Sequence, residues 1–153
     1  MSSPREELLV SLGQLPGRLA RLIEGKSRER LERAGPGGGW GAVENLAHLR
    51  DFDEVTLDRV EQILSGANPE LEVFDTDLRA IELDYHAQDP FKALADFERV
   101  RQDLIDRLAA LPPEAWQRTA RHPVLGEITL EDLIRRLAEH DEQHYETLRD
   151  EIL

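Results

Sequence analysis

Leucine and other apolar residues recur at intervals of three and four along four stretches of the chain, which is the spacing of one face of an α-helix. Within the first stretch, Pro16-Gly17 predicts a kink or a division into two collinear helices. Ser27 is a plausible N-cap for a further short helix, and the glycine-rich run 35–39 ends any helix before it. The apolar stripe of the first stretch is formed by Leu8, Leu12, Leu15, Leu19 and Leu22.

The second helix is expected over residues 41–65, where a broad apolar face suits contact with two neighbouring helices. Asn68-Pro69 closes it, because the residue before a proline disfavours the helical conformation. Residues 70–90 are acidic and show no helical period, so we interpret them as one long crossover connection. The apolar face of this helix is formed by Leu46, Leu49, Phe52, Val55, Leu57, Val60, Ile63 and Leu64.

The third helix is expected to begin near Pro90, because proline is favoured at the first helical position. Pro112-Pro113 stops this helix, since neither residue supports a helix interior. Residues 117–128 contain His122-Pro123 and Gly126 and are typical of extended or looped chain.

The fourth helix is expected to start at Leu130, because Thr129 and Asp132 resemble a capping box with Asp in place of Glu. Four amphipathic helices, with one long connection between the second and the third, predict an all-α fold. We therefore expect a four-helix bundle that occupies residues 1–153 as a single domain.

Composition excludes several classes of protein. The 153 residues include no cysteine, which rules out thiolate catalysis, disulfides and Cys-ligated zinc. A formal net charge of −13 argues against binding to nucleic acid or anionic lipid, both of which need clustered Lys and Arg. No apolar run approaches the roughly 18 residues of a membrane span, and residues 1–5 do not begin a signal-peptide pattern. We therefore expect a cytoplasmic protein that binds neither nucleic acid nor membranes.

Two histidines continue the apolar stripe of the fourth helix. His140 and His144 are four residues apart, so their imidazoles share one face and can both reach one metal ion. The alternative is that the two rings lie in water or form only a surface hydrogen bond. The motif is not that of a zinc protease, because Asp141 stands where a Glu would follow the first histidine.

A metal site needs a third ligand, and the chain offers few. His86 and His122 lie in predicted connections, where an exposed histidine is the ordinary expectation. His48 lies on the flank of the apolar face of the second helix and is the other histidine expected inside the bundle. Glu44, one turn before it, is a candidate carboxylate ligand or orienting group, although a solvated surface acid is the favoured interpretation.

Three further residues interrupt the apolar pattern. Arg101 lies between Phe97 and Leu104, and we favour a side chain that extends outward to water; the alternative is that it receives an anionic substrate group near the metal. Asp141 either accepts a hydrogen bond from a ligand imidazole or pairs with a neighbouring arginine. Trp40 is interpreted as a hydrophobic plug over one end of the bundle.

Five short motifs follow one another along the chain: Leu15-Pro16, Gly38-Gly39-Trp40, Glu44-Asn-Leu-Ala-His48-Leu, Gly126-Glu-Ile-Thr-Leu and His140-Asp-Glu-Gln-His144. In their order and separation the chain resembles, over most of its length, the DinB-like (YfiT-related) superfamily of metal-dependent proteins. The resemblance implies an up-down-down-up arrangement of four helices, often as a homodimer. It also implies a divalent metal held by one histidine of the second helix and two of the fourth, here His48, His140 and His144.

Members of this superfamily with known activity are mostly transferases and isomerases that use low-molecular-weight thiols, alongside some hydrolases. Three imidazoles leave an ion such as Zn²⁺ with an open position, as in catalytic sites, and nickel or iron would suit the same ligands. We expect a thiol-dependent transferase or hydrolase acting on a small molecule, with Glu44, Arg101 and Asp141 as candidate helpers. Any thiol must come from a small molecule, because the chain has no cysteine. The alternative is a non-catalytic, dimeric metal- or ligand-binding bundle, for example a stress-related protein.

Overall fold

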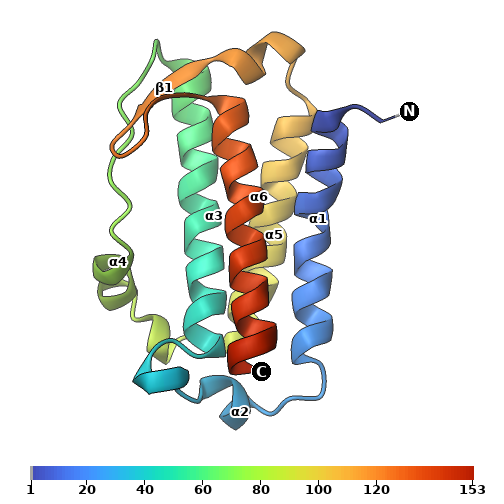
Figure 1. Ribbon diagram of the computed structural model, residues 1–153, viewed down its shortest axis with the longest axis vertical. Helices are drawn as coiled ribbons and strands as arrows, with labels where there is room; N and C mark the ends of the chain where they lie inside the picture. Colours follow the sequence, from blue (N-terminus) through green and yellow to red (C-terminus); the bar gives the residue numbers. More distant parts are fainter. Residues whose placement is uncertain (1) are drawn as a thin grey trace.

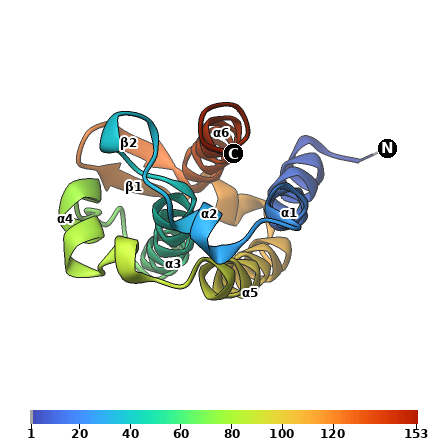
Figure 2. The same cartoon turned by 90° about the horizontal axis from the view of Figure 1, so that it is seen from below.

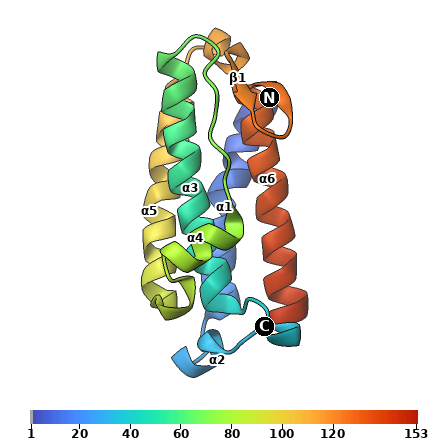
Figure 3. The ribbon, with the colours of Figure 1, turned by 90° about the vertical axis from the view of Figure 1, so that its left-hand side faces the viewer.

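The computed structural model describes residues 2–153 as a bundle of four long helices (Figure 1). Helices α1 and α6 run in one direction and α3 and α5 in the other, and α4 lies in the long connection that joins the parallel pair (Figures 1 and 3). The predicted all-α four-helix bundle is confirmed, with the up-down-down-up order. The four long helices are α1 (Pro4–Ile23), α3 (Ala42–Ser65), α5 (Pro90–Ala109) and α6 (Leu130–Thr147).

Short elements lie at both ends of the bundle and along the side of α3 (Figures 2 and 3). The crossover, expected to be irregular, contains a helix of seven residues, which is too short to show a periodic apolar pattern. The short elements are α2 (Arg28–Glu32), η1 (Pro36–Gly38), α4 (Thr76–Glu82), η2 (Tyr85–Ala87), η3 (Pro113–Gln117), β1 (Thr119–His122), β2 (Gly126–Thr129) and the π-helical η4 (Leu148–Ile152).

The predicted helix caps are present. The Ser27 side chain accepts a hydrogen bond from the backbone N–H of Arg30 at the start of α2. Thr129 and Asp132 form a reciprocal capping box at the start of α6. None of the helices within residues 2–153 is long and apolar enough to cross a membrane.

Helix α1 continues through Pro16 as one helix, rather than as two collinear pieces. Proline has no N–H, so the carbonyl of Leu12, four residues earlier, loses its helical donor. The guanidinium of Arg101 replaces that donor, with 2.9 Å between Nη1 and the Leu12 oxygen. A side chain from α5 therefore satisfies the backbone group that the proline leaves free.

Strands β1 and β2 pair antiparallel as a β-hairpin, with Thr119 opposite Thr129 and His122 opposite Gly126. The core consists of two hydrophobic clusters stacked along the bundle, one toward this hairpin and one toward α2. Each of the four long helices contributes a polar group between them: the Leu12 carbonyl, Asp53, Arg101 and Asp141. The guanidinium donates to Asp53 from Nε and Nη2 at 2.8 and 2.9 Å, and to Asp141 from Nη1 and Nη2 at 2.7 and 2.9 Å. With the Leu12 carbonyl, these acceptors use all five N–H donors of the arginine. We call this set the polar layer.

The expectation that Arg101 extends outward to water is wrong, because only 1% of the residue is exposed. Carboxylates on α3 and α6 face it from both sides, so the buried charge is compensated where it lies. Burial raises the pKa of Asp141 to about 6 despite the opposing effect of Arg101, which leaves the carboxylate ionised at pH 7. Of the two alternatives for Asp141, the structure shows the pairing with a neighbouring arginine.

Candidate metal centre

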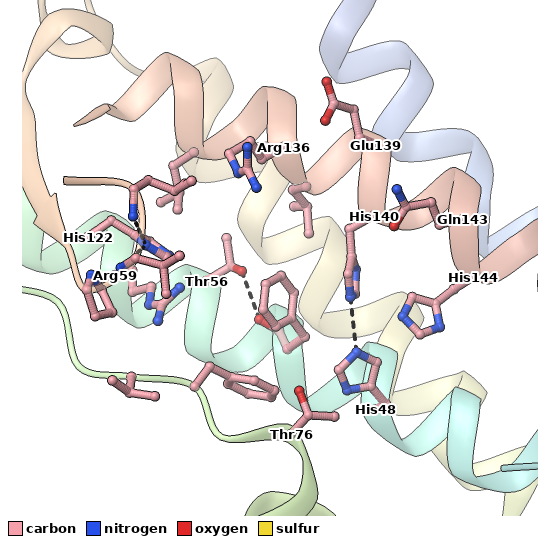
Figure 4. A pocket seen from close by; sticks show the side chains of 18 of the residues that line it. His48, Thr56, Arg59, Thr76, His122, Arg136, Glu139, His140, Gln143 and His144 are labelled. Carbon is pink, nitrogen blue, oxygen red and sulfur yellow. Dashed lines mark hydrogen bonds between the residues drawn. The ribbon is translucent and has the colours of Figure 1, made fainter. Parts of the chain in front are cut away.

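Helices α3 and α6 bring the three predicted histidines together. His48 comes from α3, and His140 and His144 come from successive turns of α6 (Figure 4). One nitrogen of each ring lies within 4.8 Å of a nitrogen of both others, and the Nε2 atoms of His48 and His140 are 3.0 Å apart. Two nitrogens each about 2.0–2.1 Å from one ion lie about 3 Å from each other. The spacing therefore fits an ion shared by the rings.

The orientation of His144 is fixed by Asn45, one turn before His48 on α3. The Nδ1 atom of His144 lies 2.9 Å from Oδ1 of Asn45, and Nδ2 of the same amide donates to the carbonyl of Gly41 at 2.9 Å. Because the amide oxygen can only accept, Nδ1 of His144 carries the proton. The lone pair on Nε2 then remains for a metal ion, as is usual where a partner sets the tautomer of a ligand histidine.

His48 and His140 differ from an ordinary core histidine in their hydrogen bonding. In both rings Nδ1 is buried and has no hydrogen-bond partner within residues 2–153. Burial, with a smaller contribution from the neighbouring imidazoles, lowers the pKa of each to about 3, and burial lowers the pKa of His144 as well. The three rings are therefore neutral at pH 7, which is the form that binds a metal.

Aromatic side chains surround the three imidazoles. The Phe52 ring stacks on His140 with 4.4 Å between ring centroids, and Trp40 and Phe74 lie 5.2 and 5.8 Å from His48. Such an apolar shell limits water around the imidazoles and strengthens electrostatic interactions among them. Trp40 therefore belongs to the wall of the histidine cluster.

The loop that carries Trp40 depends on two glycines. A Cβ atom on Gly35 would lie 2.0 Å from the Trp40 carbonyl oxygen, and one on Gly41 would lie 1.9 Å from that of Arg33. Only glycine permits these close approaches between backbone segments. The glycine-rich run thus folds the chain back on itself and delivers Trp40 and the first turn of α3 to the histidine cluster.

A cavity of about 420 Å³ opens beside the imidazoles, and its volume is within the range of small-molecule sites. Its walls come from α3, α6, the crossover and the β-hairpin (Figure 4). Residues that line it include Trp40, His48, Phe52, Thr56, Arg59, Phe74, Thr76, His122, Leu133, Arg136, Leu137, Glu139, His140, Gln143 and His144.

Asp51 holds the crossover against α3. Nε of Arg79 donates to Oδ2 of Asp51 at 3.1 Å, and the Tyr85 hydroxyl donates to the same carboxylate. Burial, followed by the bond to Asp51, raises the pKa of Tyr85, so the hydroxyl keeps its proton. These contacts fix the segment that carries Phe74 and Thr76, and so form one wall of the cavity.

The candidate helpers do not line the cavity. Arg101 and Asp141 belong to the polar layer, and neither is free to contact a substrate. Glu44 is buried, with 8% exposed, so its interpretation as a solvated surface acid is wrong. Its Oε1 accepts from the backbone N–H of Gly41 at 3.3 Å and its Oε2 lies 3.4 Å from Nδ1 of His86. Glu44 therefore caps α3 and does not face the imidazoles.

The other two histidines differ from each other. His86 is exposed, as expected. His122 is half-buried in β1 and lines the far end of the cavity, where its Nδ1 accepts from the backbone N–H groups of Val124 and Leu125 at 3.1 and 3.2 Å. The expectation of an exposed loop histidine at position 122 is therefore wrong, because the hairpin folds over the cavity.

Sequence reasoning missed Asn45, which contacts the cluster, and Arg59 and Arg136, which line the cavity farther from it. A helical period could have found the two arginines. Arg59 follows His48 by eleven residues, which is close to three full turns, and Arg136 precedes His140 by one turn. Both therefore lie on the same faces as the histidines. Asn45 also lies one turn before His48, so the same period places it near that face, but its bond to His144 depends on how α6 packs against α3.

The fold and the cluster define a class: a four-helix bundle with three convergent histidines beside a small-molecule cavity. Comparison with known proteins agrees with this class. The family model of the DinB superfamily matches residues 11–148, and the chain belongs to that superfamily.

Individual relatives and a solved structure resemble the chain over most of its length. Two proteins of Oceanobacillus iheyensis, each named "putative metal-dependent hydrolase", are 25% and 23% identical to it over 139 and 140 residues. These matches cover 90% of this chain and 80% and 79% of the relatives. YfiT from Bacillus subtilis, described as "a probable metal-dependent hydrolase with an unusual four-helix bundle topology", superposes with a TM-score of 0.86. It is 21% identical, and the match covers 97% of this chain and 86% of YfiT.

Proposed function

We propose that His48, His140 and His144 hold a divalent metal ion and that the protein is a metal-dependent enzyme acting on a small molecule. The observation that carries the proposal is the convergence of three neutral imidazoles, with Nε2 of His48 and Nε2 of His140 3.0 Å apart, beside an open cavity. The names of the relatives favour hydrolysis. Transfer to a low-molecular-weight thiol is the second candidate, because a ligand set of three histidines also suits thiolate binding.

The residues of the proposed site have different roles. His48, His140 and His144 would bind the ion, which could be Zn²⁺, Ni²⁺ or Fe²⁺, and Asn45 holds His144 in the tautomer that binds metal. When bound, the ion supplies Lewis acidity and lowers the pKa of a nucleophile at its open position. Trp40, with the phenylalanines of the cavity wall, excludes bulk water from that position. The cavity places the substrate against the cluster.

Metal analysis of protein purified without an affinity tag tests the ligand set. We expect about one equivalent of metal per chain, falling below about a tenth in His48→Ala, His140→Ala and His144→Ala. His86→Ala is the matched control and should keep its metal, since that ring is exposed and outside the cluster. Wild-type protein that neither contains metal nor takes it up on reconstitution would contradict the proposal.

The catalytic part needs its own measurement. Metal-loaded protein should hydrolyse p-nitrophenyl acetate or conjugate chlorodinitrobenzene to glutathione, and the reaction should disappear in chelator and in His144→Ala. A protein that binds metal but turns over neither probe above its metal-free form would favour a non-catalytic metal-binding bundle. The expected homodimer remains a prediction that sedimentation of the same samples can check.

A further inference from the structure

The cavity has a second polar end, away from the three imidazoles. Arg59 of α3, Arg136 of α6 and His122 of β1 line this end (Figure 4). Among the described residues that line the cavity, Glu139 is the single carboxylate, and in Figure 4 it points away from the histidine cluster. Two arginines beside one acid are a local reversal of charge in a chain of formal net charge −13.

Arg59 is a buried cation without an anionic partner. Only 4% of the residue is exposed, and its one hydrogen bond within residues 2–153 runs from Nη2 to the carbonyl of Glu72, at 2.7 Å. Burial lowers its pKa, although an arginine remains charged at pH 7. A buried charge is normally paired, because its desolvation is costly. Arg59 thus differs from Arg101, whose every donor is used, and its free donors are available to a ligand in the cavity.

Arg136 lies opposite Arg59, on α6, and forms no ion pair with another residue of the described chain 2–153. Arg59, Arg136 and His122 line the same end of the cavity, and burial, followed by the positive charges of the two arginines, lowers the pKa of His122. The imidazole of His122 is therefore neutral at pH 7 and adds no charge of its own.

We propose that Arg59 and Arg136 bind an oxyanion group of the substrate, a carboxylate or a phosphate, while its reacting group meets the three histidines. Guanidinium groups suit this task, because their planar forks donate pairs of hydrogen bonds to carboxylate and phosphate oxygens. The inference rests on the proposed function for the histidine end of the cavity. It adds to that function a substrate class, namely a small organic acid or phosphate.

The spacing along the helices sets the size of such a substrate. Arg136 precedes His140 by one turn, which is about 6 Å along α6, and Arg59 follows His48 by about 16 Å along α3. Phe52 lies between the two ends of the cavity and offers an apolar wall. The substrate therefore has its anionic group several bonds from the reacting atom, with a carbon chain between them.

Binding of two simple anions tests the proposal. Inorganic phosphate and propionate, with neutral propionamide as a blank, are titrated by calorimetry into the protein at low ionic strength. We expect at least one anion to bind and its dissociation constant to rise at least tenfold in Arg59→Met and in Arg136→Met. Methionine is chosen because replacing a buried ionic group with an apolar one of similar volume is often tolerated.

Arg135→Met is the matched control, because Arg135 is exposed, adjacent in sequence and paired with Glu131 outside the cavity. Its dissociation constant should change less than twofold. The same titrations in a His144→Ala background should give the same ratios, because the anion contacts no metal ligand. Binding of phosphate alone would indicate a phosphorylated substrate, and binding of propionate alone a carboxylate.

Several results would overturn the inference: no binding of either anion, equal weakening in Arg135→Met and Arg136→Met, or unchanged binding in Arg59→Met. The last result would leave Arg59 only its bond to the Glu72 carbonyl. If Arg59→Met fails to fold, Arg136→Met at its exposed position decides the question. Metal analysis of the same samples separates the two proposals, because anion binding without metal uptake refutes only the metal centre, and metal uptake without anion binding refutes only this inference.

Discussion

Two polar assemblies each contain residues of α3 and α6, but they differ in how their polar groups are paired. In the polar layer, the charge of Arg101 meets two carboxylates and a carbonyl, and every donor of its guanidinium has an acceptor. In the histidine cluster, three like groups face one another, two ring nitrogens are unpaired, and a cavity adjoins them. A buried charge whose donors are all satisfied supports the fold, whereas like groups that converge beside a cavity indicate a ligand.

The largest expected effect comes from breaking the polar layer. Arg101→Ala would leave the carboxylates of Asp53 and Asp141 buried without their counter-charge and the Leu12 carbonyl without its donor. We expect the free energy of unfolding to fall by about 3–5 kcal/mol. Urea denaturation measures the change.

A matched control for this prediction lies on the same helix. Arg107 of α5 pairs with Glu61, but both side chains are largely exposed, so Arg107→Ala should cost less than about 1 kcal/mol. Similar losses in the two variants would mean that the layer contributes no more than a surface pair.

The histidine cluster should show a smaller effect, and one that depends on metal. A ligand at 100 times its dissociation constant stabilises the folded state by about 2.7 kcal/mol, which corresponds to a melting temperature higher by about 5–10 °C in a domain of this size. His144→Ala should abolish this increase while changing the stability in chelator little. Calorimetry measures the melting temperature of both proteins with and without Zn²⁺. A wild-type melting temperature that does not change when Zn²⁺ is added would argue against the site.

Lowering the pH should destabilise the metal-free protein through the histidine cluster. The pKa of His48 is about 3 in the folded state and about 6.5 in the unfolded chain, so on acidification the unfolded state takes up a proton first. The stabilisation from a neutral His48 is therefore present above pH 6.5 and is lost as the pH falls toward 3. At pH 5 the loss is about 2 kcal/mol.

The measurement is the difference in unfolding free energy between wild type and His48→Asn, both in chelator, at pH 7 and pH 5. The raised pKa of Asp141 makes the folded state more stable as the pH falls, which is the opposite effect. Because Asp141 is present in both proteins, its contribution cancels in the difference. We expect the stability of wild type relative to the variant to fall by about 2 kcal/mol. A difference that does not change with pH would show that His48 titrates normally and is not desolvated.

The helical period predicted the four long helices and placed His140 and His144 on one face of the last of them. The resemblance to the DinB-like superfamily supplied His48 as the third member of the cluster. The same helical period also predicts part of the polar layer. Asp53 lies four residues from both Leu49 and Leu57 on the stripe of α3, just as Arg101 interrupts the stripe of α5. Opposite charges on two apolar stripes predict a buried pair, but each residue considered alone suggests only a side chain that reaches water.

Other features could not be read from the period of one helix. The helix in the crossover has seven residues, and its position depends on Asp51 bonding to Arg79 and Tyr85. The hairpin that carries His122 over the cavity depends on tertiary contacts as well. The arginine-lined end of the cavity combines residues from three elements, so it appears only when the chain is folded.

The smallest effect expected concerns the one histidine of the cluster whose second nitrogen is satisfied. Asn45→Leu removes the acceptor from Nδ1 of His144 and frees the ring to change tautomer and to rotate, but it removes none of the three histidines. We expect metal affinity to fall about tenfold, the lower end of what loss of such a partner costs. Competition with a chromophoric chelator measures the affinity, and Gln102→Leu, on the exposed face of α5, is the control for losing an amide elsewhere. Because His48 and His140 have no comparable partner, an affinity unchanged in Asn45→Leu would show that the packing of the rings alone, without the bond to Asn45, orients the cluster.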